Sequence, residues 1–346
     1  MIDYIKLTPA ESDTDRTMSN SPSLIDPHGR QIRYLRVSVT DRCDLRCNYC
    51  LPKGFNDFQE PSEWLNFSEM ARIIAAFARL GASQIRLTGG EPLVRKNFPD
   101  LVKKLTAIPE LTDLSLSTNA TRLAKQAEDL HQAGIERINV SLDTLNPEKF
   151  KAITQGKLEK VLDGLQAAKK AGIQPIKINM VVMKGVNDDE VVDMVNYCID
   201  NDFTLRFIET MPMGDTGREA SNQYISLEVI KQRLEKQFPL QDSQMRGAGP
   251  ARYFKIGGTN INIGFITPIS QHFCETCNRV RLTVDGTLHL CLGQEHSYPL
   301  RDRLRAGLTD TELEQHIIKA IALKPENHEF TDQPSKLVRF MSQTGG

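Results

Sequence analysis

The stretch RYLRVSVTDRCDLRCNYC, residues 33–50, joins an apolar strand pattern to three closely spaced cysteines. Its first seven residues, 33–39, are typical of a β-strand. Cys43, Cys47 and Cys50 follow in the loop after that strand. Three thiols are one fewer than the four protein ligands of a structural zinc site or a fully ligated iron–sulfur cluster. The spacing therefore raises the question of what completes the site.

Strand patterns of the same kind recur as far as about residue 210, with amphipathic runs between them. We expect one helix that is capped by Ser68 and ends at Gly81, and further helices that end at Gly134 and Gly172. The strand candidates are residues 33–39, 84–88, 112–117, 137–142, 176–182 and 204–209.

Alternation of strands with helices favours an α/β fold with a parallel sheet. Six units are too few for a closed eightfold barrel, so we expect an open, partial TIM-type barrel of about six βα units. The notable polar residues fall directly after the strand candidates. In barrels of this kind function collects at the carboxyl ends of the strands, and we therefore expect the site there.

The C-terminal part of the chain follows a different pattern. Turn signals at 257–258 and 285–286 predict a small β-rich unit over residues 245–292. Two helices are expected after it, at about 297–305 and 309–322. The expected divisions are a flexible N-terminal extension (1–28), the partial barrel (29–215) and a C-terminal extension (216–346) that carries the second cysteine group and ends in two glycines.

Composition excludes several classes of function. Lys and Arg total 43, Asp and Glu total 44, and the net charge of -1 gives no overall field that would favour nucleic acid or an anionic membrane. The sequence contains no apolar run near the roughly 18 residues of a membrane span and no secretory signal. We predict a cytoplasmic protein, in which clustered cysteines indicate metal or redox chemistry. Cys198 stands alone in an apolar helical pattern and is expected to be a core thiol.

A second group of three cysteines lies near the C-terminus, at Cys274, Cys277 and Cys291. A structural zinc ion could complete its ligand set with His272 or His289. An iron–sulfur cluster fits the spacing equally well, so spacing alone leaves both open.

Basic residues follow the second of these cysteines in the pattern N-R-x-R, formed by Asn278, Arg279 and Arg281. Alternate residues of a strand share a face, so the two arginines are expected to point the same way. Beside a cluster, such a pair suits an anionic or planar ligand, whereas away from the cysteines it would be an ordinary solvated strand face.

The first cysteine group is best explained by a [4Fe–4S] cubane with one iron left without a protein ligand, although zinc remains an alternative. Tyr49 precedes the third cysteine, and Gly89, Gly90 and Glu91 of a GGEP segment follow the second strand. The glycines permit close backbone approach, and the glutamate offers a carboxylate. Together these motifs resemble the radical S-adenosylmethionine superfamily.

Longer segments resemble one family within it, the GTP 3′,8-cyclases (molybdenum cofactor biosynthesis protein A). The resemblance runs through nearly everything after residue 29, and HFCETCNRVRL at 272–282 is its most specific part. It implies S-adenosylmethionine and two [4Fe–4S] clusters, one held by each cysteine group. The matching segments include LTGGEPLVR (87–95), STNA (117–120), SLDT (141–144), LRFIETMP (205–212) and GFITPISQHFCETCNRVRLTVDGTL (264–288).

The resemblance also implies binding roles for single residues. The cofactor would be bound by Tyr49, Gly89, Gly90, Glu91, Ser141 and Met211. GTP would be bound by Arg36, Arg86, Thr118, Lys177, Asn278, Arg279 and Arg281.

The implied reaction begins when S-adenosylmethionine yields a 5′-deoxyadenosyl radical. That radical takes the 3′ hydrogen of GTP, and the ribose carbon then joins C8 of the guanine. An external electron donor is implied, the product passes to the cyclic pyranopterin monophosphate synthase, and the enzyme is a monomer or homodimer. The alternatives are a two-cluster, peptide-modifying radical enzyme and a zinc-stabilised binding module.

Two further expectations concern the tail and one turn. The resemblance implies that Gly345 and Gly346 reach into the active site, whereas the alternative is a frayed end. Ala120 stands where the family usually has glycine, and alanine lacks glycine's access to positive φ, so we expect that turn to differ slightly.

Overall fold

The computed structural model describes residues 23–51, 54, 59–245, 249–330 and 337–345. Within them, twelve strands form a single sheet in the order β12-β11-β10-β1-β2-β3-β4-β5-β6-β9-β8-β7. The strands are β1 (Tyr34–Ser38), β2 (Gln84–Thr88), β3 (Asp113–Thr118), β4 (Arg137–Ser141), β5 (Ile176–Val182), β6 (Thr204–Glu209), β7 (Leu240–Ser243), β8 (Arg252–Ile256), β9 (Asn262–Ile266), β10 (Arg279–Leu282), β11 (Thr287–His289) and β12 (Ser297–Pro299).

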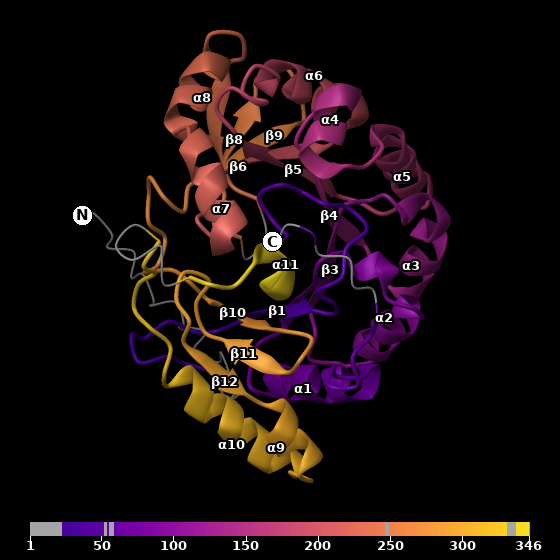
Figure 1. Ribbon diagram of the computed structural model, residues 1–346, viewed down its shortest axis with the longest axis vertical. Helices are drawn as coiled ribbons and strands as arrows, with labels where there is room; N and C mark the ends of the chain where they lie inside the picture. Colours follow the sequence, from indigo (N-terminus) through magenta and orange to yellow (C-terminus); the bar gives the residue numbers. More distant parts are fainter. Residues whose placement is uncertain (1–22, 52–53, 55–58, 246–248, 331–336, 346) are drawn as a thin grey trace, which may run out of the picture.

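Helices cover the outer face of this curved sheet, and α1, α2, α3, α5 and α6 follow one another around it (Figure 1). The predicted α/β class is confirmed. The helices are α1 (Phe67–Arg79), α2 (Phe98–Thr106), α3 (Ala127–Ala133), α4 (Pro147–Thr154), α5 (Leu158–Lys170), α6 (Val191–Asn201), α7 (Gly214–Ala220), α8 (Leu227–Glu235), α9 (Arg301–Arg305), α10 (Asp310–Ile321) and α11 (Met341–Thr344), with short 3-10 turns η1 (Pro92–Val94), η2 (Leu123–Lys125) and η3 (Ser221–Gln223).

The sheet is parallel in its centre and antiparallel at both edges. From β10 through β1 to β6 and β9 all neighbouring strands run parallel, whereas β11 and β12 at one edge and β8 and β7 at the other are antiparallel. The β-rich unit expected over residues 245–292 is present as strands β8 to β11, but it forms part of the central sheet and not a sheet of its own. Its strands β9 and β10 join β6 and β1, and thereby lengthen the parallel core by one strand on each side.

The local boundaries agree with the sequence pattern except at two helix starts. Helix α1 begins after Asn66, whose side chain accepts from the amides of Ser68 and Glu69, so the predicted cap at Ser68 is wrong. Asn66 and Glu69 form a reciprocal capping box, in which each side chain accepts a hydrogen bond from the other residue's backbone amide. This arrangement starts the helix before Ser68 and leaves Ser68 inside the first turn. Residues 297–299 form β12 rather than the start of a helix, because they pair with β11. The predicted helix end at Gly134 is confirmed.

The inner face of the sheet is lined by buried polar side chains. Arg86, Lys177 and Arg206 are 5 to 7% exposed, and Ser115 and Asn139 are also buried. The large apolar residues instead fill the layer between the sheet and the helices. Since burying several cations is costly unless they have a ligand or partner, the polar interior marks the functional side of the sheet.

The start of the described chain is tied to the core. Leu24 is buried and its amide donates to the carbonyl of Leu80 at 3.2 Å. The Asp26 carboxylate pairs with Arg30 at 2.6 Å. Residues 23–28 of the expected flexible extension are therefore anchored, and residues 1–22 lie outside the described part of the chain.

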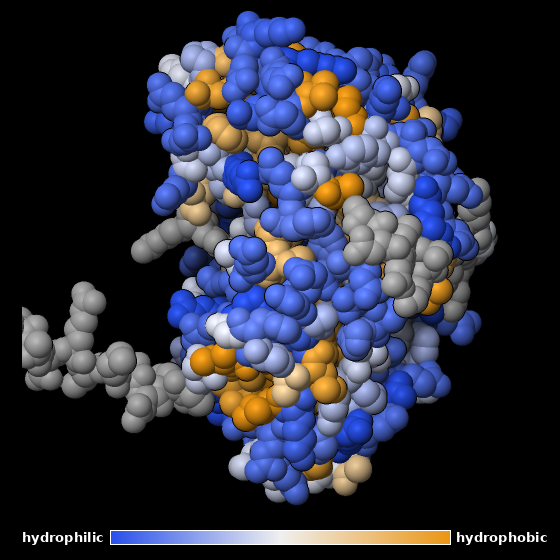
Figure 2. All heavy atoms as spheres, turned by 90° about the vertical axis from the view of Figure 1, so that its left-hand side faces the viewer, coloured by the Kyte–Doolittle hydropathy of each residue, from blue (hydrophilic) through white to orange (hydrophobic). Residues whose placement is uncertain are grey.

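The outer surface is mainly hydrophilic. Figure 2 shows a face on which polar side chains predominate and apolar ones gather only in patches. None of the described helices is long and apolar enough to cross a membrane.

Candidate active site

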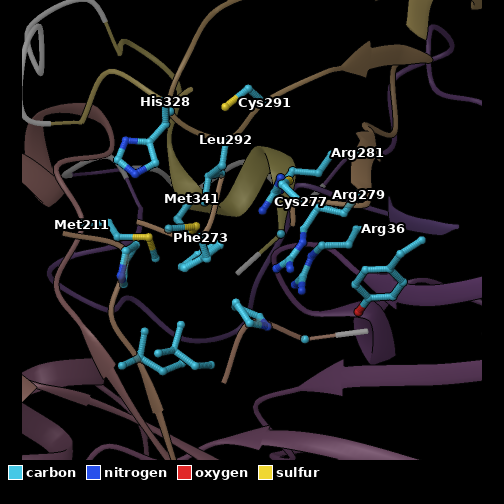
Figure 3. Close-up of a pocket in the computed structure, with 18 of the residues that line it drawn as sticks. Arg36, Met211, Phe273, Cys277, Arg279, Arg281, Cys291, Leu292, His328 and Met341 are labelled. Atoms are coloured by element: carbon cyan, nitrogen blue, oxygen red, sulfur yellow. The ribbon is translucent and has the colours of Figure 1, made fainter. Parts of the chain in front are cut away.

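A cavity of about 150 Å³ opens at the inner face of the sheet. Strands β1, β2, β6 and β10 contribute to its lining, and so does the C-terminal helix α11. Figure 3 shows Arg36, Arg279 and Arg281 directed into this space, near Cys277. The cavity therefore gathers residues from both ends of the chain.

Parallel register sets the arginines of this cavity side by side. Arg36 on β1 lies opposite Arg281 on β10 and opposite Arg86 on β2. Burial lowers the pKa of Arg36 to about 9 and that of Arg86 to about 10, although the nearby Tyr34 opposes the shift in both cases. The Nε atoms of Arg86 and Arg281 are buried and have no hydrogen-bond partner within the described residues. A row of guanidinium groups with unused donors is suited to a polyanion such as a triphosphate.

The second cysteine group lies in the wall of the same cavity, where Cys274, Cys277 and Cys291 all contribute. Burial opposes ionisation of Cys277, but the nearby charges of Lys324 and Arg279 outweigh it and lower its pKa. This environment favours the thiolate, which is the form that binds metals.

Buried cations hold the loops that carry these cysteines. The guanidinium of Arg30 donates to the carbonyl of Cys274 at 2.9 Å, and the Lys324 ammonium donates to that of Leu290 at 2.5 Å. Arg339 reaches the carbonyl of Leu292 at 3.2 Å. The positive charges offset the negative charge that three thiolates bring to a cluster.

The histidines that were considered as zinc ligands have other surroundings. His272 Nδ1 lies 3.1 Å from Nε2 of His328, and burial lowers the pKa of His289 to about 3. The thiols of a single tetrahedral zinc would lie within about 4 Å of one another. Across the described ranges, no group of three or more His, Cys, Asp or Glu side chains is placed to hold one metal ion.

The remaining residues expected at GTP lie outside the cavity lining. The Thr118 hydroxyl donates to Glu91 at 2.8 Å, and the Lys177 ammonium lies 5.5 Å from the centre of the Tyr253 ring. The carbonyl of Asn278 accepts the amide of Tyr34 at 3.2 Å.

The sequence reasoning missed Arg206, which does line the cavity. Its guanidinium donates to Asn179 at 2.8 Å and to Asn139 at 2.6 Å. Its position in LRFIETMP, as a charged residue between apolar neighbours in a strand pattern, was the signal that could have revealed it.

The first cysteine group follows β1 and is enclosed by several other elements. Burial raises the pKa of all three thiols, in the case of Cys50 to about 12. The charges of Cys50 and Cys43 also raise the pKa of Cys47. Tyr49 donates its hydroxyl to Asp143 at 2.6 Å and thereby fixes the loop to the end of β4. Three adjacent thiols in a shielded site fit a cluster that binds thiolates.

The GGEP segment is joined to the cysteine loop. A Cβ atom on Gly89 would lie 2.3 Å from the Thr40 carbonyl, and one on Gly90 would lie 2.3 Å from that of Arg42. The close approach that these glycines permit is therefore to the chain before Cys43. Glu91 is fully buried, and its oxygens accept from Leu93, Thr118 and Asn119. Burial raises its pKa to about 7.

Ser141 and Met211, the other residues expected at the cofactor, flank the same end of the sheet. Ser141 is exposed as the last residue of β4. Met211 follows β6 and lines the cavity. The structure therefore places both at the carboxyl ends of strands, where the sequence pattern predicted the site.

The C-terminal tail reaches both cysteine groups. Met341 lines the cavity, and the backbone of Ser342 forms a hydrogen bond with Cys50. Gly345 has φ of 74°, and a Cβ atom there would lie 2.2 Å from Cγ2 of Thr88. Glycine is thus needed at 345 for both conformation and space. Gly346 lies outside the described residues.

Comparison with known sequences identifies the family. The Radical SAM superfamily profile matches residues 37–198, and the Molybdenum Cofactor Synthesis C profile matches residues 203–330. The GTP 3′,8-cyclase of Hydrogenovibrio crunogenus is 48% identical over 94% of this chain and 100% of its own length. The chain belongs to the GTP 3′,8-cyclase family. The GTP 3′,8-cyclase of Rhizobium etli is 47% identical (93% of this chain, 94% of the relative), and GTP 3′,8-cyclase 2 of Pseudomonas aeruginosa is 46% identical (95% and 100%).

Two solved structures of one protein share the fold of this member of the GTP 3′,8-cyclase family. Streptococcus suis SuiB bound to S-adenosylmethionine superposes with a TM-score of 0.62 at 14% identity, over 86% of this chain and 69% of that chain. SuiB bound to the precursor peptide SuiA gives a TM-score of 0.60 at 14% identity, over 86% and 67%. At this identity the likeness concerns the fold alone.

Proposed function

We propose that this chain is a lyase that cyclises GTP to (8S)-3′,8-cyclo-7,8-dihydroguanosine 5′-triphosphate, the first step of molybdopterin biosynthesis. One observation carries the assignment at the site: the cavity holds the second cysteine group and the arginine row together. GTP would place its guanine at the cluster and its triphosphate at the arginines, so the second cysteine group and the arginine row must lie no farther apart than the length of one nucleotide. Membership of the GTP 3′,8-cyclase family supports the same substrate.

Two [4Fe–4S] clusters and S-adenosylmethionine are the cofactors. A reduced cluster at the first cysteine group would supply the electron for reductive cleavage of S-adenosylmethionine. The first cluster is assigned to Cys43, Cys47 and Cys50, and the second to Cys274, Cys277 and Cys291.

The chain's own residues bind and orient the two small molecules. Arg36, Arg86 and Arg281 bind the triphosphate, since their guanidinium groups stand in one row. Arg279 shares their cavity, and Met211 borders it on the side of the cofactor. The buried wall excludes water, which protects a radical from side reactions.

The other assigned residues act at the rim and behind the wall. Tyr49, Gly89, Gly90, Glu91 and Ser141 shape the cofactor site, with the glycines and Glu91 acting through the loops that they join. Thr118, Lys177 and Asn278 support the GTP site from outside the cavity lining.

The finer architecture belongs to the same proposal. The curved sheet forms a partial barrel. Residues 1–28 form an extension, residues 29–215 form the barrel that binds S-adenosylmethionine, and residues 216–346 supply the auxiliary cluster and substrate site.

The location and partners are proposed as well. The protein is cytoplasmic and is a monomer or homodimer, and its product passes to the cyclic pyranopterin monophosphate synthase. An external donor of low potential delivers the electrons.

A peptide-modifying radical enzyme is the principal competing function. The fold of SuiB resembles this one, but at 14% identity, whereas the GTP 3′,8-cyclases are 46 to 48% identical. A cavity rich in buried arginine also suits a nucleotide better than an extended peptide. A zinc-stabilised binding module would need a single-ion geometry that neither cysteine group provides among the described residues.

The deciding experiment is anaerobic turnover. Protein with both clusters reconstituted is mixed with dithionite, S-adenosylmethionine and GTP, and 5′-deoxyadenosine and the cyclised nucleotide are quantified. We expect both to form in equal amounts and only with GTP, while ATP serves as the matched control nucleotide. Formation of 5′-deoxyadenosine that is indifferent to GTP would overturn the substrate assignment. Bound zinc without iron would overturn the enzyme assignment.

A further inference from the structure

Asn119 occupies the point where the cysteine loop meets the end of β3. Its side-chain Nδ2 lies 3.6 Å from the sulfur of Cys43 and 2.9 Å from a carboxylate oxygen of Asp44. The sulfur of Cys43 also accepts the backbone amide of Leu45 at 3.4 Å. Asn119 therefore contacts Cys43, a cysteine of the first group, but is not itself a ligand of the cluster assigned to that group.

The hydrogen bonds that Asn119 Oδ1 accepts fix the orientation of its side-chain amide. Its Oδ1 accepts the backbone amide of Thr121 at 3.0 Å and the Thr121 hydroxyl at 2.7 Å. A backbone amide can only donate, so the oxygen of Asn119 must face Thr121. The NH2 group must then face Cys43 and Asp44, and one hydrogen is available for each of them.

The backbone of Asn119 is held equally firmly. Its amide donates to the buried carboxylate of Glu91 at 2.6 Å, and the Thr118 hydroxyl donates to the same carboxylate at 2.8 Å. The amide of Ala120 donates to the Thr118 hydroxyl at 3.0 Å. Glu91 thus places Asn119 against the cysteine loop, which gives this glutamate a role apart from any contact with the cofactor.

We propose that Asn119 is a positioning residue that donates an N–H···S hydrogen bond to Cys43 and thereby eases one-electron reduction of the first cluster. The inference rests on the proposed function, because it takes Cys43 to be a ligand of that cluster. Reduction makes the cluster one charge more negative, and a donor that faces a ligand sulfur stabilises the more negative form. Glu91 and Asp44 bring negative charge to the same region, so a donor at the sulfur opposes their effect.

The test compares three variants of the full-length, reconstituted protein in an anaerobic redox titration followed by EPR. Asn119→Ala removes the donor to sulfur, and Asp44→Asn removes the adjacent negative charge. Thr121→Val removes the hydroxyl that joins Asp44 and Asn119 but leaves the donor to sulfur in place. The step of the first cluster is recognised because its signal changes when S-adenosylmethionine is added.

Opposite shifts are the expected signature. At the potential that half-reduces the parent cluster, Asn119→Ala lowers the ratio of reduced to oxidised cluster roughly three- to tenfold, and tenfold corresponds to about 59 mV for one electron. Asp44→Asn raises that ratio, while Thr121→Val leaves it within experimental error. Iron content stays at the parent level in all three variants.

Two results would overturn the assignment. If the reduction potential of the first cluster is unchanged in Asn119→Ala, the hydrogen bond from Asn119 to Cys43 has no effect on reduction. Equal negative shifts in all three variants would show that Asn119 only anchors the loop. Failure of the underlying function looks different, because the parent protein itself would then lack a signal that responds to S-adenosylmethionine.

Discussion

Arg36 on β1 lies directly opposite Arg281 on β10, in parallel register, although the two residues belong to opposite ends of the chain. Arg86 continues the row on the other side of Arg36. Each arginine projects from the same face of its strand because paired positions in a parallel sheet share a face. The sheet thus builds one cationic surface from segments that lie far apart in the sequence.

Loss of one arginine from this row should weaken GTP turnover without stopping cofactor cleavage. We expect Arg281→Ala to lower kcat/KM for GTP about 10- to 100-fold, since a hydrogen bond to a charged group contributes roughly 1.5–3 kcal/mol. With GTP present, 5′-deoxyadenosine should still form, now in excess over the cyclised nucleotide. Arg72→Ala, on the outer side of α1, is the matched control. Unchanged GTP kinetics in Arg281→Ala would remove Arg281 from the site.

The two cysteine groups should hold iron independently. We expect Cys47→Ser to lower the iron content from about eight to about four atoms per chain and to abolish formation of 5′-deoxyadenosine, because a ligand of one cubane is lost. Cys198→Ala should keep about eight, since Cys198 is buried in the core. Iron and labile sulfide analyses provide the measurement. Full iron content in Cys47→Ser would contradict the assigned ligand set.

Ala120 adopts a φ of 62°, the conformation that glycine favours, so its turn stores strain. The left-handed conformation costs an alanine about 1–2 kcal/mol, and Ala120→Gly would remove this cost. Glycine also gives the unfolded chain more conformational freedom, which reduces the resulting stabilisation by about 0.4–1 kcal/mol. Ala120→Gly should therefore raise the free energy of unfolding by about 0.5–1 kcal/mol. Ala76→Gly, inside α1, should lower it by about 1 kcal/mol. Thermal unfolding followed by circular dichroism tests whether the two shifts in Tm have opposite signs.

Because of Lys177, the free energy of unfolding should increase with pH in the alkaline range. Burial, followed by the charge of Arg206, lowers the pKa of Lys177 from 10.5 to about 8. Between these values the unfolded chain binds the proton and the folded chain does not, so the free energy of unfolding rises with pH. Below pH 8 both states are protonated and the contribution is constant.

The variant Lys177→Met should lack this increase, whereas Lys160→Met, at an exposed position, should retain it. Tm values measured from pH 7.5 to 10 test the difference between the variant and parent curves. Parallel curves for the parent and Lys177→Met would show that Lys177 titrates as it does in the unfolded chain.

The sequence predicted the features that depend on neighbouring residues. The six strands from β1 to β6 and the helix end at Gly134 follow from local periodicity and from glycine at a helix terminus. The positions of β9 and β10 could not be predicted in this way, because pairing with β6 and β1 is decided by which buried edge is available. An apolar run does not specify its neighbour in the sheet.

The site shows the same limit. Arg279 and Arg281 could be placed on one face from their alternation, and both line the cavity. The carboxylate of Glu91 could be recognised as notable, but its partners Thr118 and Asn119 come from the next strand. Contacts between the ends of different strands require the register of the sheet, which a single sequence does not contain.

The meeting of both chain ends at one site has a consequence for how the protein is made. Arg30 supports the carbonyl of Cys274 across 244 positions of sequence, and the last helix, α11, contributes to the same cavity. Synthesis proceeds from the N-terminus at about 5–20 residues per second, so β1 leaves the ribosome well before its partner β10 exists. The lining of the cavity is therefore completed only after β10 and α11 have followed β1 out of the ribosome, which places assembly of this site late in synthesis.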